Sequence, residues 1–269
     1  MNSPRDFIRE ICAEEGIEVM SLSHDYVLQL TKNDVSRRIF GAYWDLNSAA
    51  ADRIACDKTA CYNILHSICI PSIKHELIFN PLKRMGFPNA NGAWNHALGL
   101  FKAFGGKVVV KPNQGTKGQD VYYCDSIPTF EAAAQTIFLT YPDAAVSPYQ
   151  DIETEYRVFY IDGKCPFVYG KSRGETWQHN LSQGASAFEI PESEANKKRL
   201  AVLKALASRA AEGIGICFAT IDIAESQGEG MSVLEINSGV QARQLLEQIP
   251  NRRDTIKAIY RAAVLKMLL

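Results

Sequence analysis

The chain lacks several features that would indicate a membrane, a nucleic acid or an oxidising compartment. No apolar run approaches the roughly 20 residues that cross a bilayer, and the N-terminal segment Met-Asn-Ser-Pro-Arg-Asp has no signal-peptide pattern. The formal net charge is -1 over 269 residues, with both signs mixed along the chain, so we expect neither a nucleic-acid nor a membrane partner. The seven cysteines are odd in number and never in Cys-x-x-Cys spacing. We therefore expect reduced thiols in a cytoplasmic protein.

Internal repeats and low-complexity tracts are also absent, and the spacing of apolar residues predicts short strands and helices. Several neighbouring strands join as hairpins, as at Asp162-Gly163. The sequence therefore predicts an α+β fold rather than a doubly wound parallel sheet. Two stretches are expected to be irregular, 72–92 and 172–190. The predicted helices cover 4–15, 49–68, 94–104, 128–139, 192–211 and 253–268, and the predicted strands cover 17–22, 27–31, 39–44, 107–111, 121–124, 144–149, 155–161, 165–170, 220–224 and 232–237.

The most informative residues lie in the last predicted hairpin. Asp222 belongs to an alternating strand, and Glu235 and Asn237 stand two residues apart in the next strand, so they share one face. Pairing the strands brings together two carboxylates and one amide oxygen, which are the hard ligands that Mg²⁺ prefers beside phosphate and water. For Asp222 alone, a solvated surface carboxylate is the better interpretation. The combination predicts a magnesium–nucleotide site.

A second chemical signal is a glycine-containing loop between two predicted strands. It follows Lys111 and contains Gly115, Lys117 and Gly118. Glycines allow backbone N–H groups to approach an anion closely, and the lysines add positive charge. The loop is not a Walker A loop, because the Gly-x-x-x-x-Gly-Lys-Ser/Thr pattern is absent and no helix follows. An ordinary hairpin turn with a surface lysine stays open as the alternative.

Three other basic residues, Lys58, Arg157 and Arg173, do not indicate a binding role when each is considered alone. Lys58 follows Asp57 inside a predicted helix, where a lysine is nearly always solvated. Arg157 and Arg173 lie on neighbouring strands and could each grip a phosphate or a carboxylate through two hydrogen bonds. A surface salt bridge is the better interpretation of either arginine alone. The order of these pieces along the chain is more informative than any one of them.

In that order the pieces resemble the ATP-grasp family, and within it the RimK-like carboxylate–amine ligases. The resemblance covers residues 48–245. It rests on Asp57-Lys58 ahead of Ile70-Pro71, the strand and glycine loop after Lys111, a hinge at 146–149, Glu155-x-Arg157, Trp177-x-x-Asn180, and Asp222 with Glu235-x-Asn237.

The resemblance implies two α+β lobes that clasp ATP, with a shortened N-terminal region before them. The implied domains are an N-terminal region at 1–47, a linker helix and insert at 48–106, a small lid at 107–150 and a large subdomain carrying the metal site at 151–269. The implied ligands of ATP are Lys58, Lys111, Gln114, Gly115, Thr116, Lys117, Gly118, Pro148 and Tyr149. One or two Mg²⁺ ions, with Mn²⁺ as an alternative, are implied at Asp222, Glu235 and Asn237. The residues implied to face the γ-phosphate and the carboxylate substrate are Arg157, Lys171, Arg173 and Asn180.

The implied activity is an ADP-forming ligation that joins an amino-acid or peptide carboxylate to an amine through an acyl phosphate. A small-molecule kinase of the same fold and a non-catalytic ATP-binding regulatory protein stay open as alternatives. The segment after Asn237 reads Ser-Gly-Val, without the Pro-Gly of relatives, so the acceptor is undetermined. Thr220 replaces an arginine found in some members and leans away from the D-alanine ligase branch. The short N-terminal region leaves room for a second copy of the chain or a partner protein to complete the site.

Overall fold

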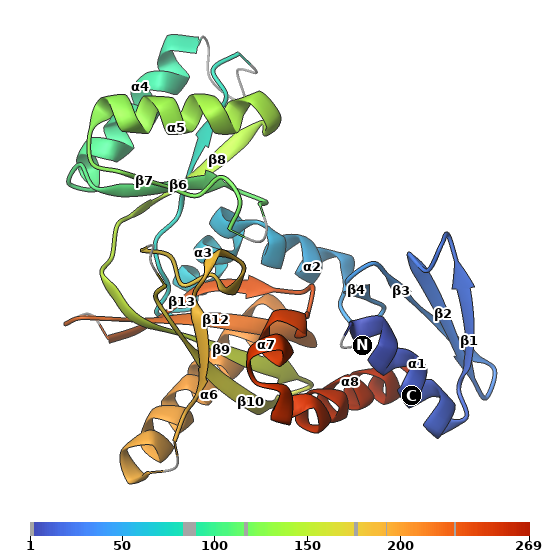
Figure 1. The fold of residues 1–269 in the computed structure, drawn as a ribbon. Helices are drawn as coiled ribbons and strands as arrows, with labels where there is room; N and C mark the ends of the chain where they lie inside the picture. Colours follow the sequence, from blue (N-terminus) through green and yellow to red (C-terminus); the bar gives the residue numbers. More distant parts are fainter. Residues whose placement is uncertain (1–2, 83–89, 116–117, 175–176, 192, 229) are drawn as a thin grey trace.

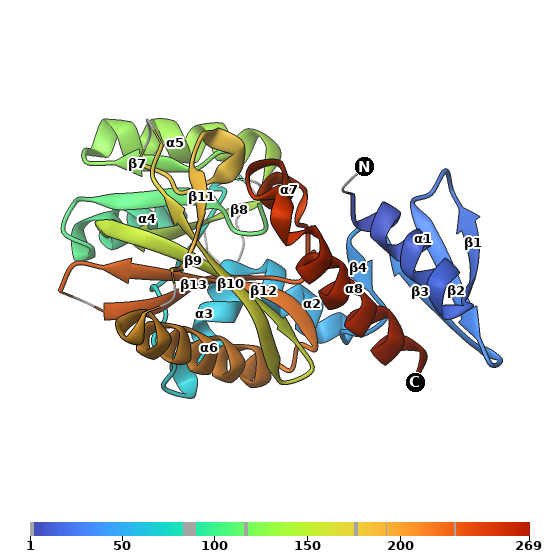
Figure 2. The ribbon, with the colours of Figure 1, turned by 60° about the horizontal axis from the view of Figure 1, so that its bottom comes forward.

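A computed structural model describes residues 3–82, 90–115, 118–174, 177–191, 193–228 and 230–269. Three sheets with helices packed on them form a small lobe, a large lobe and an N-terminal region beside the large lobe (Figures 1 and 2). The ladder pairings within all three sheets are antiparallel, so the predicted α+β class is confirmed. None of the described helices combines the length and apolar character that crossing a bilayer requires.

The N-terminal region is one helix followed by a four-stranded meander. α1 (Pro4–Glu15) begins with a capping box on Ser3 and ends at Gly16, whose φ of 62° is the left-handed conformation that glycine accepts. The strands β1 (Glu18–Leu22), β2 (Val27–Lys32), β3 (Val35–Phe40) and β4 (Tyr43–Trp44) are neighbours in chain order. The prediction of one strand over 39–44 is wrong, because Gly41 adopts a φ of 62° and turns the chain between β3 and β4.

The long helix predicted over 49–68 is in fact two helices, α2 (Ala49–Cys56) and α3 (Lys58–Ser67). They are separated by Asp57, whose backbone is extended at φ -98° and ψ 107°. Its carboxylate accepts a hydrogen bond of 2.9 Å from the backbone N–H of Ala60 and so caps α3. The prediction failed because the helical spacing of apolar residues continues across the cap. The break makes Lys58 the first residue of α3.

The small lobe is built on a sheet in the order β5-β8-β6-β7. Its elements are β5 (Glu76–Phe79), α4 (Ala90–Ala103), β6 (Val108–Pro112), β7 (Tyr122–Cys124), α5 (Ile127–Thr140) and β8 (Asp143–Pro148). One core, with Ile78, Phe101 and Phe130 among its members, joins the sheet to both helices. The expected irregularity of 72–92 is therefore wrong at β5, which pairs with β8. The small lobe begins ahead of residue 107, where we expected the lid to start.

The large lobe is built on a sheet in the order β11-β10-β9-β12-β13. Its strands are β9 (Ile152–Ile161), β10 (Lys164–Ser172), β11 (Ser186–Glu189), β12 (Phe218–Ser226) and β13 (Gly230–Asn237), and its helices are α6 (Glu194–Ile214), α7 (Arg243–Gln248) and α8 (Arg253–Leu268). The Asp162-Gly163 turn has φ of 46° and 79°, as the predicted type I′ hairpin requires. Sequence reasoning missed β11 and α7, whereas it placed α8 at its observed bounds.

Strand alternation separates the two faces of this sheet. Tyr156, Val158 and Tyr160 of β9 point into a core with α6, α2 and α3. Phe159 and Ile161 point the other way, into a core with α1 and α8. Arg157 precedes Phe159 by two residues and belongs to the second face. The candidate site thus lies on the face away from α6, beneath the small lobe (Figure 1).

Candidate active site

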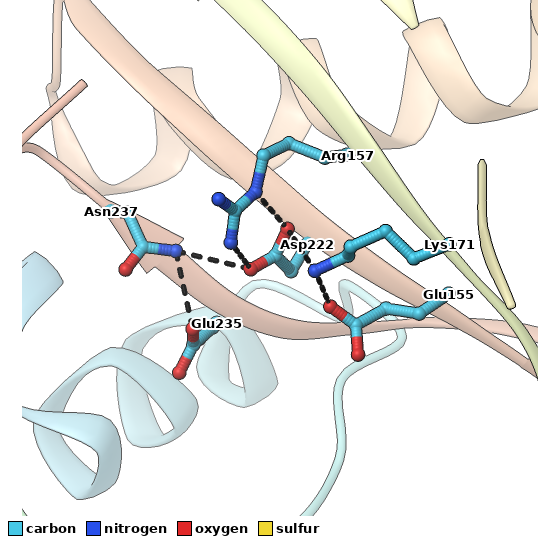
Figure 3. A network of polar contacts seen from close by, with 6 residues as sticks. All are labelled: Glu155, Arg157, Lys171, Asp222, Glu235 and Asn237. Carbon is cyan, nitrogen blue, oxygen red and sulfur yellow. Dashed lines mark hydrogen bonds and ion pairs between the residues drawn. The ribbon is translucent and has the colours of Figure 1, made fainter. Parts of the chain in front are cut away.

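The predicted hairpin of Asp222 and Glu235 is present, and the two residues are directly paired across β12 and β13. Asn237 lies opposite Thr220 in the same ladder. Its amide Nδ2 donates to Asp222 Oδ2 and to Glu235 Oε1, each at 3.2 Å (Figure 3). The two carboxylates and the Asn237 amide therefore lie on one face, as alternation predicted, and the amide presents its nitrogen to both carboxylates.

Two cations on neighbouring strands surround Asp222. Arg157 faces it across β9 and β12 and donates two hydrogen bonds, from Nε to Oδ1 at 2.7 Å and from a terminal nitrogen to Oδ2 at 2.5 Å. Lys171 Nζ lies 3.4 Å from Oδ1. Burial alone would raise the pKa of Asp222, which is 1% exposed, but Arg157 and Lys171 lower that pKa well below its ordinary range. The two cations therefore favour the ionised form of Asp222.

Lys171 also contacts Glu155, its partner across β9 and β10 (Figure 3). Burial opposes the charge of Lys171, yet the two carboxylates beside it raise its pKa. Burial raises the pKa of Glu155 to about 7, although Lys171 acts in the opposite direction. Glu155, Asp222, Lys171 and the partly exposed Arg157 thus form a cluster of two acidic and two basic side chains on one face of the sheet.

The donor set fits a divalent cation of the magnesium type. Asp222 and Glu235 offer carboxylate oxygens that already converge on one polar hydrogen-bond donor, and Asn237 can offer its amide oxygen. The described residues contain no group of three or more His, Cys, Asp or Glu side chains suited to a metal. A few oxygen ligands with open positions suit Mg²⁺, which keeps water and phosphate in its shell.

Two lysines approach this cluster from the small lobe and from α3. Lys111 of β6 is only 7% exposed, and no hydrogen bond or ion pair is recorded for its ammonium within the described ranges. Burial lowers the pKa of Lys111 to about 8, and the positive charge of Lys58 acts in the same direction. Lys58 Nζ donates to the backbone oxygens of Asn113 at 3.3 Å and Gly115 at 2.8 Å. An ammonium on a largely buried side chain, with no acceptor among the described residues, can bind an anion such as phosphate.

The first half of the glycine loop is attached to the start of α3. Asn113 is 1% exposed, its Nδ2 donates to Asp57 at 2.8 Å, and its Oδ1 accepts from the backbone N–H of Thr59 at 3.2 Å. Gln114 Nε2 also donates to Asp57, at 3.3 Å. Sequence reasoning missed Asn113. Its place directly after Lys111-Pro112 was the available signal, but its partner is 56 positions away.

The second half of the loop contacts the segment of Asn180. A Cβ on Gly118 would lie 2.1 Å from Asn180 Nδ2, and the φ of Gly118 is 67°, so only glycine fits. Gln183 Nε2 donates to the backbone oxygen of Gly118 at 2.8 Å. The predicted ATP ligands Thr116 and Lys117 lie outside the described residues.

The predicted hinge follows β8. Pro148 pairs with Val108 across β6 and β8, and the backbone N–H of Tyr149 donates to the Lys107 oxygen at 2.9 Å. The ring of Tyr149 lies 4.7 Å from that of Tyr123 and 6.1 Å from that of Trp177, measured between centroids. Three rings from the lid, the hinge and the Asn180 segment thus meet at one place.

Among the described residues, Arg173 has no recorded hydrogen bond or ion pair with the cluster around Asp222. Its guanidinium contacts the Asp151 carboxylate, and its Nε donates to the Ile152 backbone oxygen at 3.1 Å. These partners lie at the start of β9, beside the hinge. The other predicted residues of the large lobe, Arg157 and Lys171, lie in the cluster itself.

Comparison with known proteins links this geometry to one fold. No family model matches the chain. An "Alpha-aminoadipate--LysW ligase LysX" from Saccharolobus solfataricus is 26% identical over 172 residues, which cover 60% of this chain and 54% of that protein. The chain thus spans about half the length of this curated relative.

Solved structures agree at the level of the fold. D-alanine--D-alanine ligase from Bacillus anthracis, complexed with ATP, has a TM-score of 0.60 at 16% identity and covers 82% of this chain and 67% of its own. The ATP-grasp ligase PsnB, complexed with a precursor variant, Mg and ADP, has a TM-score of 0.55 at 17% identity and covers 82% and 62%. These likenesses show that the chain has the ATP-grasp fold.

Proposed function

We propose that this protein is an ATP-dependent, ADP-forming ligase that joins an amino-acid or peptide carboxylate to an amine. The observation that carries the proposal is the convergence of Asp222, Glu235 and Asn237 on one face, with Arg157 and Lys171 beside them. Phosphoryl transfer requires charge neutralisation and positioning more than covalent help from the protein. This cluster offers both.

In the proposal, ATP lies between the two lobes. Lys58 and Lys111 bind its phosphates, and the segment 114–118, including Thr116 and Lys117, closes over the β- and γ-phosphates. Pro148 and Tyr149 lie beside the adenine. Two observations support this arrangement: the Lys111 ammonium has no partner among the described residues, and Asn113 is attached to Asp57.

Asp222, Glu235 and Asn237 would hold one or two Mg²⁺ ions, or Mn²⁺. Such an ion neutralises charge on the transferring phosphoryl group. Arg157 and Lys171 fix the Asp222 carboxylate in its ionised form, and Asn180 lies against the glycine loop where it can reach the γ-phosphate. Arg173 stays a prediction only, since its guanidinium is held by Asp151.

The reaction balances in two steps. A carboxylate oxygen of the donor attacks the γ-phosphorus, the bond to the β-phosphate oxygen breaks, and ADP leaves. The amine then attacks the acyl carbon, inorganic phosphate leaves, and the amine loses a proton as the amide forms. The lid excludes water that would hydrolyse the acyl phosphate.

The printed names of the relatives give different substrates, α-aminoadipate with LysW, D-alanine, and a precursor. We carry over only the shared class, a carboxylate and an amine, within a RimK-like scheme. The seven cysteines are all unpaired, which supports a cytoplasmic location. We also propose that a second copy of the chain or a partner protein completes the site on the side of the N-terminal region. The division into four domains at 1–47, 48–106, 107–150 and 151–269 is part of the same proposal.

The proposal is tested with Mg²⁺, ATP and a heavy-oxygen label in the donor carboxylate. We expect ADP release that requires a donor and an amine, an amide product by mass spectrometry, and label in the released phosphate. A stable phosphorylated product formed without any amine would instead identify a kinase. Tight ATP binding without turnover, across amino-acid and peptide donors, would identify a binding protein.

A further inference from the structure

A small cavity lies between α3 and β13, next to the proposed metal ligands. Its volume is about 10 Å³, which is room for about one water molecule. Lys58 and Cys61 of α3, Ser72 and His75 of the segment that leads to β5, and Glu235 of β13 contribute to its lining. The cavity therefore adjoins both a lysine proposed for phosphate and a carboxylate proposed for the metal.

Two buried polar atoms in this lining have no protein partner within the described part of the chain. They are His75 Nε2 and Ser72 Oγ. His75 is 2% exposed, and its Nδ1 lies 2.9 Å from the Ile73 backbone oxygen. A carbonyl oxygen can only accept, so Nδ1 carries the hydrogen and Nε2 of the neutral ring presents a lone pair.

The charges around His75 keep the ring neutral. Burial lowers the pKa of His75 well below its ordinary value, and Lys111 and Lys58 lower it further. A buried acceptor and a buried hydroxyl without partners each leave an uncompensated desolvation cost, which a single water removes.

We propose that this cavity is a hydration site in which His75 Nε2 and Ser72 Oγ hold one water against Glu235. The water donates one hydrogen to Nε2 and accepts the hydrogen of Ser72, so its second hydrogen is directed to the Glu235 carboxylate. Glu235 accepts from Asn237 through Oε1, and no hydrogen bond to its Oε2 is recorded within the described residues. His75 is thereby a positioning residue for the metal ligand Glu235.

The inference rests on the proposed function, because the water can affect metal binding only if Glu235 is a metal ligand. Groups that orient a metal ligand affect metal affinity about 10–100-fold when they are removed. His75 reaches neither the metal nor the nucleotide in this arrangement. Its removal should weaken metal binding and leave metal-free nucleotide binding unchanged.

The test is Mn²⁺ binding by the full chain in the presence of a non-hydrolysable ATP analogue, followed by electron paramagnetic resonance. We expect His75→Phe to weaken Mn²⁺ affinity about tenfold or more, and Ser72→Ala to weaken it in the same direction without threatening the fold. His75→Gln restores an amide group near the position of Nε2 and should recover affinity. His66→Phe is the matched control, since His66 is exposed and stacks on Tyr62 at 5.4 Å.

Unchanged Mn²⁺ affinity in both His75→Phe and Ser72→Ala would overturn the inference. Equal losses in His75→Gln and His75→Phe would also overturn it, because packing rather than an acceptor would then be responsible. If the wild-type protein binds the nucleotide analogue but no Mn²⁺, the proposed metal site fails first and this inference fails with it.

Discussion

At the scale of single residues, Lys111 combines a stability cost with a binding role. Its side chain is largely buried, and its ammonium has no acceptor among the described residues. A largely buried charge without a partner destabilises the folded state. We expect Lys111→Met to raise the unfolding free energy of the nucleotide-free protein and to weaken ATP affinity at least tenfold. Urea unfolding and a nucleotide titration check both effects. Lys107→Met, at an exposed position ahead of the same strand, should change neither.

The same residue predicts a pH dependence. The pKa of Lys111 is about 8 in the folded protein and 10.5 in the reference state, so between these values the folded state binds fewer protons than the unfolded state. Stability therefore rises with pH through this window. The unfolding free energy of the wild type should be lower than that of Lys111→Met at pH 8, and this difference should become smaller as the pH rises to 10. A difference that stays constant with pH would contradict a buried ammonium at this position.

Asp222 and Glu235 differ in what holds them, although both are proposed metal ligands. Asp222 neutralises Arg157 and Lys171 in a buried cluster, whereas Glu235 has only the Asn237 amide as a recorded partner among the described residues. Breaking a buried ion pair by removing one partner costs about 3–5 kcal/mol. Asp222→Asn should therefore destabilise the protein by a similar amount, while Glu235→Gln leaves the unfolding free energy nearly unchanged. Both should abolish magnesium-dependent ADP release.

Urea unfolding and an ADP-release assay on the two variants separate these roles. Equal loss of stability in both would mean that Glu235 is a structural residue of the hairpin. Retained ADP release in Glu235→Gln would remove it from the metal site.

At the scale of elements, the cap of α3 connects the helix to the lid. Asp57 caps α3 and also accepts hydrogen bonds from Asn113 and Gln114 at the start of the glycine loop. Asp57→Ala should cost about 1–2 kcal/mol of stability and also weaken ATP affinity, because the loop loses its anchor. The matched control is Ser193→Ala, which removes the cap of α6, where Ser193 accepts from Asn196 at 3.1 Å. That variant should lose stability and keep its ATP affinity.

Calorimetric titration with ATP compares the two cap variants directly. Equal ATP affinity in Asp57→Ala and Ser193→Ala would show that the contacts of Asp57 with the loop have no part in binding.

The elements also show where sequence reasoning is sufficient. Alternation in β12 and β13 placed Asp222, Glu235 and Asn237 on one face, because the period of a strand fixes the direction of each side chain. The pairing of Asp222 with Arg157 was not predictable, since it depends on the register between β9 and β12, 65 positions apart. The edge strands β5 and β11 were missed because each has only four residues and gains its structure from one neighbour. The helix break at Asp57 was missed because the helical spacing of apolar residues is the same on both sides of this N-cap.

At the scale of the whole molecule, the N-terminal region shares a hydrophobic core with the large lobe, whereas the small lobe has a separate core. The rings of Phe7 and Trp44 stack on Tyr260 of α8 at 5.6 and 5.9 Å between centroids. Tyr260 Oη in turn donates to the backbone oxygen of Val240 at 3.0 Å, in the loop that follows Asn237. The small lobe has its own core, which includes Phe130. The two cores should therefore respond independently to mutation.

Hydrogen exchange read by mass spectrometry tests this division. Phe7→Ala removes a fully buried ring and should cost about 3–5 kcal/mol, with faster exchange in α8, in β12 and in the loop around Val240. Phe130→Ala removes a ring of the same size from the small lobe and should accelerate exchange only in β5–β8, α4 and α5. Faster exchange confined to residues 4–44 in Phe7→Ala would mean that the N-terminal region folds as a unit of its own. The N-terminal region would then have no influence on the loop beside the proposed metal ligands, and it would not support the candidate site.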